Sequence, residues 1–210
     1  MNILNLFAGI GGNRTLWGDE HEITAVENNE QIANIYQKRF PNDLLYLTDA
    51  YQYLEEYYKN FDFIWASPPC QSHTRMVAFP SFKPMLPDLR LYSIIIFLRR
   101  FFKGKWVVEN VISHYEPIIK PTALIDRHYF WSNLPLKNKR FQKPSGNFKD
   151  LPKEILCSFL YVDQNLIESL PSQLNGSHDN KRKVLRNCVI PEVGKYILDS
   201  VNTITMEEFL

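Results

Sequence analysis

The sequence predicts an α/β protein in which a parallel sheet carries helices on both of its faces. Segments of strand character alternate with helical patterns through the first two-thirds of the 210 residues, and this alternation is typical of βαβ units. The residues with the most distinctive chemistry follow expected strands. Because ligands bind at the carboxyl ends of the strands in such sheets, the sequence also predicts a ligand site along that edge.

Each expected element has a local signal. The helix over 31–40 stops before Pro41 and the helix over 91–102 stops near Gly104, since proline and glycine end helices. Pro191 suits the first turn of a last helix with an apolar face. The expected strands cover 3–8, 23–27, 44–47, 63–66, 107–111 and 128–131, and a further expected helix covers 52–58.

Two segments interrupt the alternation. Residues 71–87 contain three prolines and few periodic apolar residues, which indicates a long loop. Residues 133–180 combine four prolines with an Asn-Gly turn, which indicates a small lobe of low regularity. We therefore expect a core at 1–132, the lobe at 133–180, and a C-terminal segment at 181–210 that returns to the core.

Composition narrows the class of protein. A hydrophobic content of 45% and a charged content of 22% are those of a soluble globular protein. The longest apolar stretch is too short to span a bilayer, and no basic leader precedes the first strand. Three widely spaced cysteines do not form a disulfide framework. We expect a cytoplasmic monomer with reduced thiols and no metal site.

The distribution of charge says more than the net charge of +1. Lysine and arginine gather at 137–149 and again at 181–186, where acidic residues are sparser. Such a surface fits contact with phosphate groups. The alternative is a solvated, lysine-rich surface without a partner.

A glycine turn follows the first expected strand. Gly9, Gly11 and Gly12 permit a sharp turn and close approach of the backbone to a ligand. Glu27 and Asp49 end the next two strands, where carboxylates can accept hydrogen bonds from ribose hydroxyls and from an adenine amino group. Each feature alone is also explained by a structural turn, a helix cap or a surface acid. Together they favour an adenosine-containing cofactor, and the absence of a Walker lysine disfavours ATP.

A thiol and an acid occupy later strand ends. Cys70 follows the fourth expected strand, and Glu109 comes directly after Trp106-Val107-Val108. The alternative for Cys70 is an inert packing residue, and the alternative for Glu109 is a cap or an ion-pair partner. A carboxyl group on a central strand is costly unless it has a role.

In order and wording these motifs resemble the cytosine-5 DNA methyltransferases. The matching segments are Phe7-Ala8-Gly9-Ile10-Gly11-Gly12, Pro69-Cys70-Gln71 and Glu109-Asn110-Val111. The resemblance implies a Rossmann-like class I methyltransferase sheet with a small, irregular target-recognition lobe. It also implies that S-adenosyl-L-methionine is the cofactor and S-adenosyl-L-homocysteine the product. The chain is similar to compact, phage-type members.

The resemblance assigns roles residue by residue. Cys70 attacks carbon 6 of cytosine, Glu109 protonates ring nitrogen 3, and Arg127 supports the base. Ile125 stands where the first arginine of the family's Arg-x-Arg motif would be, and Asp88-x-Arg90 resembles a motif near the methionine end of the cofactor. The implied cofactor-binding residues are Phe7, Ala8, Gly9, Gly11, Gly12, Glu27, Asn28, Asp49, Ala50, Pro69, Asn187 and Val189.

The resemblance further implies double-stranded DNA as the substrate, with the target cytosine flipped out of the helix. The loop over 71–87 would close on it, and the lobe would read the sequence. A cognate restriction enzyme is a further expected partner. By chemistry the candidate base readers are Asn138, Arg140, Gln142, Asn147 and Gln173.

Two alternatives stay open. Ser67-Pro68-Pro69-Cys70-Gln71 followed by Thr74-Arg75 also resembles the tRNA-acting branch of the superfamily. A non-catalytic DNA-binding module is the other alternative, and Ile125 in place of an arginine is the feature that favours it.

Overall fold

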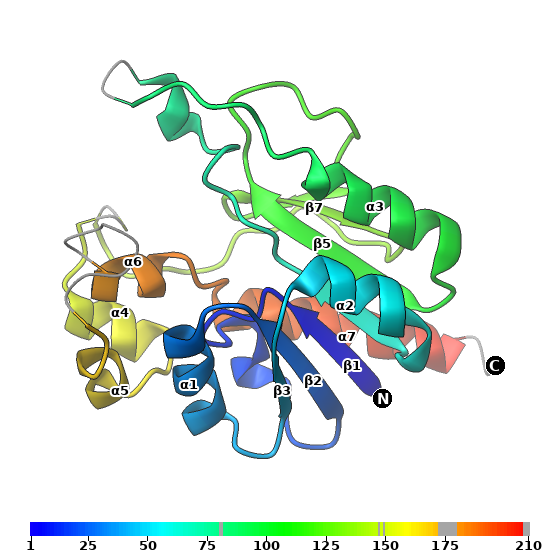
Figure 1. The fold of residues 1–210 in the computed structure, drawn as a ribbon, viewed down its shortest axis with the longest axis horizontal. Coiled ribbons are helices and arrows are strands. Elements are labelled where there is room, and N and C mark those ends of the chain that lie inside the picture. Colours follow the sequence, from blue (N-terminus) through cyan, green and yellow to red (C-terminus); the bar gives the residue numbers. More distant parts are fainter. Residues whose placement is uncertain (80–81, 147, 149, 172–179, 208–210) are drawn as a thin grey trace.

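A seven-stranded mixed sheet forms the centre of the protein (Figure 1). The structure is a computed structural model and describes residues 1–79, 82–146, 148, 150–171 and 180–207. The strands are β1 (Asn2–Leu6), β2 (Glu22–Glu27), β3 (Leu44–Leu47), β4 (Phe63–Ala66), β5 (Lys105–Val111), β6 (Ala123–Ile125) and β7 (His128–Ser132). The helices are α1 (Glu30–Arg39), α2 (Ala50–Tyr57), α3 (Arg90–Phe101), α4 (Lys153–Phe159), α5 (Gln164–Glu168), α6 (Asn180–Arg186) and α7 (Pro191–Glu207), with 3-10 turns η1 (Asn13–Leu16), η2 (Tyr58–Asn60) and η3 (Arg75–Ala78).

The strand order is β3-β2-β1-β4-β5-β7-β6. The first five strands along this order are parallel, whereas β7 is antiparallel to both β5 and β6. The predicted parallel sheet is therefore confirmed for five strands, and the antiparallel end formed by β7 and β6 is a feature that the alternation did not predict. Residues 112–122 contain no helix that could carry a parallel crossover, and β6 joins β7 through a tight turn in which Asp126 has a φ of +54°. Such a short connection can join only antiparallel strands.

Helices cover both faces of the sheet, as the sequence predicts. Leu4, Ile64 and Val108 pack beneath α2 and α3, while Trp65 and Val107 pack against the face covered by α1 and α7. Figure 1 shows α2 and α3 together on the near side of the sheet. Within the described residues, no helix combines the length and the apolar character that crossing a membrane requires.

The predicted boundaries of the main helices and strands lie within two residues of the observed ones. β6 was missed, because three residues offer too short a pattern to recognise. The lobe predicted to be irregular contains the short helices α4 and α5, and Asp163 caps α5 by accepting a hydrogen bond from the Asn165 N–H at 2.9 Å. α6 packs against α4 rather than on the sheet.

A buried ion pair fixes the segment after the glycine turn. Arg14 in η1 donates to both carboxylate oxygens of Asp43, at 3.0 and 3.1 Å, and the Tyr36 hydroxyl donates to the same carboxylate at 2.7 Å. The side chains of Arg14 and Asp43 are almost fully buried. A buried pair of this kind contributes through its geometry, and removal of one partner leaves a buried charge without compensation.

Asp43→Ala should therefore lower the free energy of unfolding by about 3 to 5 kcal/mol. Asp19 is the matched control, because its carboxylate lies 3.5 Å from the same guanidinium but the side chain is 93% exposed. Asp19→Ala should cost at most about 1 kcal/mol. Urea denaturation of the two variants measures the difference, and equal losses would show that burial does not decide the strength of this pair.

Candidate functional site

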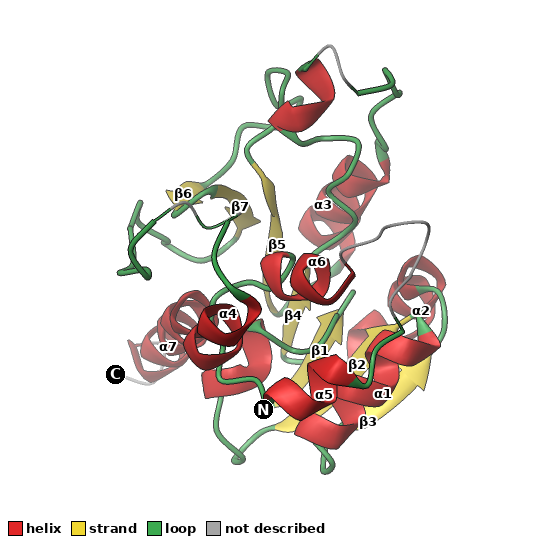
Figure 2. Ribbon diagram, turned by 90° about the vertical axis from the view of Figure 1, so that its left-hand side faces the viewer, coloured by secondary structure: helices red, strands yellow, loops and turns green. Residues whose placement is uncertain are grey.

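The candidate site lies where the strand order reverses. Counting from β1, the chain proceeds to β2 and β3 on one side and to β4 and β5 on the other. Ligands bind at such switch points, outside the carboxyl ends of the strands. The glycine turn follows β1 and the Cys70 loop follows β4, so the two candidate motifs flank the reversal. Figure 2 looks onto the sheet from the side of α6, which lies over β4 and β5 in this view.

The three glycines of the turn have different physical roles. A Cβ on Gly9 would meet nothing within 4 Å, so the backbone there faces open space. A Cβ on Gly11 would lie 2.3 Å from a ring carbon of Phe40, and one on Gly12 would lie 2.4 Å from the carbonyl oxygen of Val189. Gly9 therefore offers a surface for a ligand, whereas Gly11 and Gly12 are required for packing.

Phe7 begins the turn in a left-handed conformation with a φ of +56°. A non-glycine residue in this region carries strain, and such strain is found most often at functional sites. The ring is partly exposed and packs edge-on against Tyr51, with 5.1 Å between ring centroids. The Arg90 guanidinium lies 4.6 Å from the Tyr51 centroid and is held by Asp88. These side chains form an aromatic wall beside the exposed Gly9 backbone, which suits a planar adenine.

Glu27 and Asp49 are both occupied by backbone groups. The Glu27 carboxylate accepts hydrogen bonds from the N–H groups of Gly9, Asn28 and Asn29, at 3.0, 3.0 and 2.9 Å. Since a carboxylate has about four acceptor positions, one remains for a ribose hydroxyl. Asp49 caps α2 by accepting hydrogen bonds from the N–H groups of Tyr51 and Gln52. The helix-cap reading of Asp49 is therefore observed, and its contact with adenine stays a prediction.

The other predicted cofactor residues divide by exposure. Asn28, Pro69 and Asn187 are exposed, while Ala8 and Ala50 are buried. Val189 is also buried, and its carbonyl group is the one that packs on Gly12. The buried members can shape a cofactor site through the backbone.

The loop that carries Cys70 is tied to the neighbouring strand. Asn110 is buried on β5, and its Nδ2 donates to the Pro68 carbonyl oxygen at 2.9 Å while its Oδ1 accepts from the Val111 N–H. Parallel pairing of Ala66 with Val108 aligns the ends of β4 and β5. The sequence analysis gave Asn110 no role, although a buried amide beside a buried acid is a recognisable signal.

Cys70 itself is a partly exposed free thiol. Its pKa is raised to about 11, first by desolvation and then by the charge of Glu109, while Lys183 on α6 acts in the opposite direction. The thiol is protonated at neutral pH in this state, so it needs loss of a proton before it can attack a base. The influence of Lys183 places α6, which contains the second basic cluster, within electrostatic range of the Cys70 thiol.

Glu109 is a buried acid with 7% exposure. Burial raises its pKa to about 7, and a hydrogen bond with Ser67 acts in the lowering direction. A carboxyl group with such a pKa can hold a proton near neutral pH and donate it, as a general acid must. The structure thus confirms that Glu109 is desolvated, and neither a helix cap nor a full ion pair accounts for it.

Arg127 lies apart from both of these groups in its described contacts. It is exposed, in the turn after Asp126, and its guanidinium stacks over the Phe148 ring at 4.8 Å. Ile125 is fully buried among apolar side chains. The support that the Arg-x-Arg motif implies is therefore not formed by either position in this structure, and the role of Arg127 stays a prediction.

The base of the long loop is fastened at both ends. The Asp88 N–H donates to the Ser72 hydroxyl at 2.9 Å, and Thr74 forms a β-bridge with Ser113. His73 is buried with its Nδ1 2.6 Å from the Tyr115 hydroxyl. Beyond this base the loop exposes large apolar side chains, namely Phe79, Phe82, Met85, Leu86 and Leu89.

The predicted base readers have mixed surroundings. Asn138 accepts a hydrogen bond from the Leu124 N–H at 2.8 Å and so fixes β6. Arg140 and Gln142 are exposed. Asn147 and Gln173 lie outside the described residues. Several basic residues of the two clusters form ion pairs, including Lys143 with Asp126 and Lys181 with Glu168, which agrees with the solvated-surface alternative for those positions.

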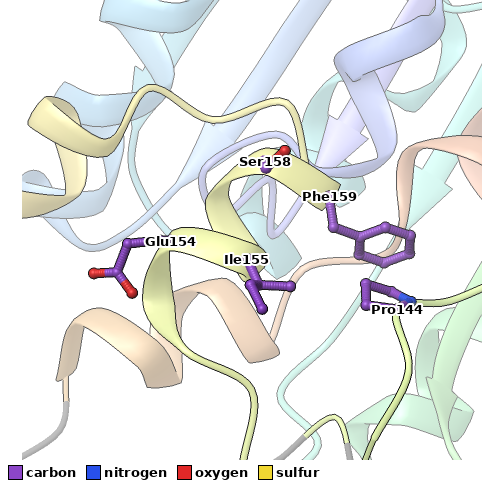
Figure 3. A pocket seen from close by; sticks show the side chains of 5 residues that line it. All are labelled: Pro144, Glu154, Ile155, Ser158 and Phe159. Carbon is purple, nitrogen blue, oxygen red and sulfur yellow. The ribbon is translucent and has the colours of Figure 1, made fainter.

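A hollow of about 460 Å³ lies on the lobe (Figure 3). It is lined by Pro144, Glu154, Ile155, Ser158 and Phe159. Its lining is mostly apolar, and it includes neither the predicted nucleophile nor the predicted acid. The hollow therefore does not mark the candidate site at the strand ends.

Comparison with known proteins finds a family match in the first part of the chain. The family model of the C-5 cytosine-specific DNA methylases matches residues 1–76, a span that includes the glycine turn and Cys70. This match implies S-adenosyl-L-methionine as the cofactor. No curated protein matches the sequence.

Two solved structures are similar to this chain over nearly its whole length. A DNMT2 mutant from Spodoptera frugiperda has a TM-score of 0.58 and 16% identity, and the alignment covers 95% of this chain and 99% of that one. The Entamoeba histolytica methyltransferase EhMeth has a TM-score of 0.50 and 13% identity, with 96% and 97% covered. The likeness shows that the mixed sheet and its helices form the Rossmann-like fold of these methyltransferases.

The buried acid predicts a pH-dependent stability. A carboxyl group whose folded pKa is raised from 4.5 to about 7 destabilises the folded state as pH rises through that interval. The penalty is absent below pH 4.5 and complete above pH 7, where it amounts to about 3 kcal/mol. The free energy of unfolding of Glu109→Gln minus that of the parent protein should therefore be larger at pH 8 than at pH 4.5, by about this amount.

Denaturant unfolding of the two proteins at both pH values measures this change. Glu116→Gln, at an exposed position, supplies the reference for loss of a surface carboxylate. A difference that is the same at both pH values would mean that Glu109 is not the desolvated acid.

Proposed function

We propose that the protein transfers a methyl group from S-adenosyl-L-methionine to carbon 5 of a cytosine in double-stranded DNA. The observation that carries the proposal is the juxtaposition of a cysteine loop and a buried acid of raised pKa on neighbouring strands, held together by the bond from Asn110 to Pro68. Carbon 5 of cytosine is a weak nucleophile, and a thiolate together with a proton donor can activate it.

Cys70 and Glu109 divide the activation of the base. The Cys70 thiolate forms a bond from Sγ to carbon 6, while Glu109 gives its proton to ring nitrogen 3. The electrons displaced from the ring double bond make carbon 5 nucleophilic. Carbon 5 would then take the methyl group from the sulfonium, which would leave as the thioether S-adenosyl-L-homocysteine. Loss of the carbon 5 hydrogen as a proton to solvent water restores the double bond and expels Sγ, and nitrogen 3 returns its proton to Glu109.

The cofactor supplies an electrophilic methyl group on a sulfonium. On the protein side, the open backbone at Gly9 and the wall of Phe7, Tyr51 and Arg90 would hold its adenosine part. Glu27 has one acceptor position left for a ribose hydroxyl. Phe7 and Gly9 follow β1, which is the neighbour of the strand β4 that leads to Cys70, and Glu27 ends β2. Tyr51 and Arg90 belong to the first turns of α2 and α3.

A cytosine inside a duplex cannot reach Cys70, so the proposal includes flipping of the base. Unstacking costs a few kcal/mol, which contacts with the extruded base and the phosphates offset. The apolar tip of the 71–87 loop can occupy the space that the base leaves, and the exposed Arg140 and Gln142 suit contacts with base edges. A role in genome modification beside a restriction enzyme, or in a phage, is part of the same proposal.

The covalent step gives the sharpest test. Duplex DNA that carries 5-fluorocytosine should trap the protein with tritiated S-adenosyl-L-methionine as a labelled adduct that survives a denaturing gel, because fluorine cannot leave as a cation. Cys70→Ser should form no adduct while still binding the cofactor. Cys157→Ser is the matched control, since its thiol is buried in the lobe, and it should form the adduct normally.

An adduct that persists in Cys70→Ser would remove Cys70 as the nucleophile. An adduct with fluorocytosine-substituted tRNA but not with DNA would replace the DNA proposal by the RNA alternative, which the Ser67–Gln71 segment followed by Thr74-Arg75 favours. In a single-turnover assay, Glu109→Gln should slow methyl transfer by roughly 10²- to 10⁴-fold.

The glycine turn gives an independent test of the cofactor site. Gly9→Ala should bind S-adenosyl-L-methionine at least about tenfold more weakly, because the alanine Cβ enters the open space proposed for the cofactor. The left-handed φ at this position should also cost about 1 kcal/mol of stability. Gly11→Ala should be destabilised more, because the methyl group would collide with Phe40. Calorimetric titration and thermal unfolding separate the two effects. Unchanged binding in Gly9→Ala would place the cofactor elsewhere.

A further inference from the structure

Three side chains stand in line across the antiparallel end of the sheet. The strands β6, β7 and β5 are neighbours in that order, Ile125 pairs with His128, and His128 pairs with Val111. Directly paired residues share a face of a sheet, and so do residues two apart along a strand. Ile125, His128 and Glu109 therefore point to the same side, and His128 stands between the other two.

His128 contacts the acid directly. Its Nε2 lies 3.6 Å from Glu109 Oε1, and the two side chains are 24% and 9% exposed. The pKa of His128 is lowered to about 3, first by desolvation and then by the positive charges of Arg127 and Lys143. At neutral pH the contact thus joins an uncharged ring to a carboxyl group and is not an ion pair.

We propose that His128 is the positioning residue of Glu109, in the place that the first arginine of an Arg-x-Arg motif would take. Its Nε2–H faces Oε1 and leaves Oε2 to carry the proton that passes to cytosine. The catalytic part of this inference rests on the proposed function. An arginine at position 125 would have to reach past His128 to make the same contact.

A neutral partner suits an acid better than a cation does. A guanidinium beside Glu109 would stabilise the carboxylate and lower the pKa of the group that has to donate. A neutral N–H orients the carboxyl group and stabilises the carboxylate that remains after proton transfer, with a smaller effect on the starting state. Ile125 adds apolar surface and no charge. An isoleucine at position 125 and a neutral histidine at position 128 therefore both favour the protonated form of Glu109.

The titratable and charged groups around Glu109 come from several elements. Ser67, at the end of β4, forms a hydrogen bond with the carboxyl group. Cys70 responds to the charge of Glu109 and to that of Lys183 on α6. Arg127 in the β6–β7 turn and Lys143 in the lobe are the charged groups that lower the pKa of His128.

The test uses variants that remove or keep the donor. His128→Phe removes the N–H donor, and the side chain of His128→Asn is too short to bring its donor to Glu109. His128→Gln retains an N–H donor of similar reach. Tyr129→Phe is the control, because Tyr129 is the next residue on β7 and points to the opposite face. Each variant is also combined with Glu109→Gln, so that the pH dependence of the unfolding free energy gives the pKa of Glu109 without an activity assay.

Loss of the donor should raise the pKa of Glu109 by about one unit, since the carboxylate loses the N–H dipole that lies 3.6 Å from Oε1. It should also slow single-turnover methyl transfer at least about tenfold, with unchanged cofactor binding and with the alkaline limb of the pH profile moved upward by the same amount. His128→Gln should recover part of both changes. If His128→Phe fails to fold, His128→Asn carries the same comparison.

An unchanged pKa of Glu109 in both donor-free variants would overturn the inference, as would an equal loss of rate in Tyr129→Phe. The stability measurement separates this inference from the proposed function. A protein that methylates no cytosine substrate but shows the pKa shift would refute the proposed reaction and retain the coupling between His128 and Glu109.

Discussion

Desolvation of one carboxyl group is the constraint around which this edge of the sheet is arranged. Glu109 lies near the end of the strand β5 and is almost fully buried, and its pKa is near 7 for that reason. A cationic neighbour would stabilise the folded protein but would lower this pKa, so that the group would be deprotonated at neutral pH and could not donate a proton. The chain places an isoleucine and an uncharged histidine on that side instead. Stability and acidity are in conflict at this position, and the arrangement favours acidity.

The same burial disfavours the reactive form of Cys70. Desolvation and the nearby Glu109 carboxyl group raise the pKa of Cys70 to about 11, so the thiol keeps its proton at neutral pH. Lys183 acts in the lowering direction, and a closer cation would lower this pKa further. In the proposed reaction, the thiol has to lose its proton before it can attack the base.

Much of the core could be predicted from the sequence, because periodic apolar segments and breaking residues are local signals. The strand ends that carry Gly9, Cys70 and Glu109 were found in this way. The antiparallel strands β6 and β7 depend on a tight turn at Asp126 and on pairing with β5, and neither has a strong local pattern. The helices of the lobe were missed for a similar reason, since they are short and rely on packing against each other.

The roles of single residues were harder to predict than their positions. Gly11 and Gly12 read as ligand-binding glycines in the sequence, yet their missing side chains make room for Phe40 and for the backbone of Val189. Asn110 donates to the Pro68 carbonyl oxygen, and His128 Nε2 lies 3.6 Å from Glu109. These contacts join residues far apart in the chain, so a one-dimensional pattern contains no record of them. The Asp49 cap is local, and the sequence left it open as an alternative.

The close approach at Gly12 also has a consequence for biosynthesis. A ribosome delivers the glycine turn early, but the backbone against which that turn packs belongs to residues 188–189, and Gly194 at the start of α7 approaches Asn13 just as closely. The chain up to about residue 194 must therefore leave the ribosome before the first loop of the sheet can settle into its final shape. During translation, the nascent chain would acquire its strands in order and complete its earliest loop last.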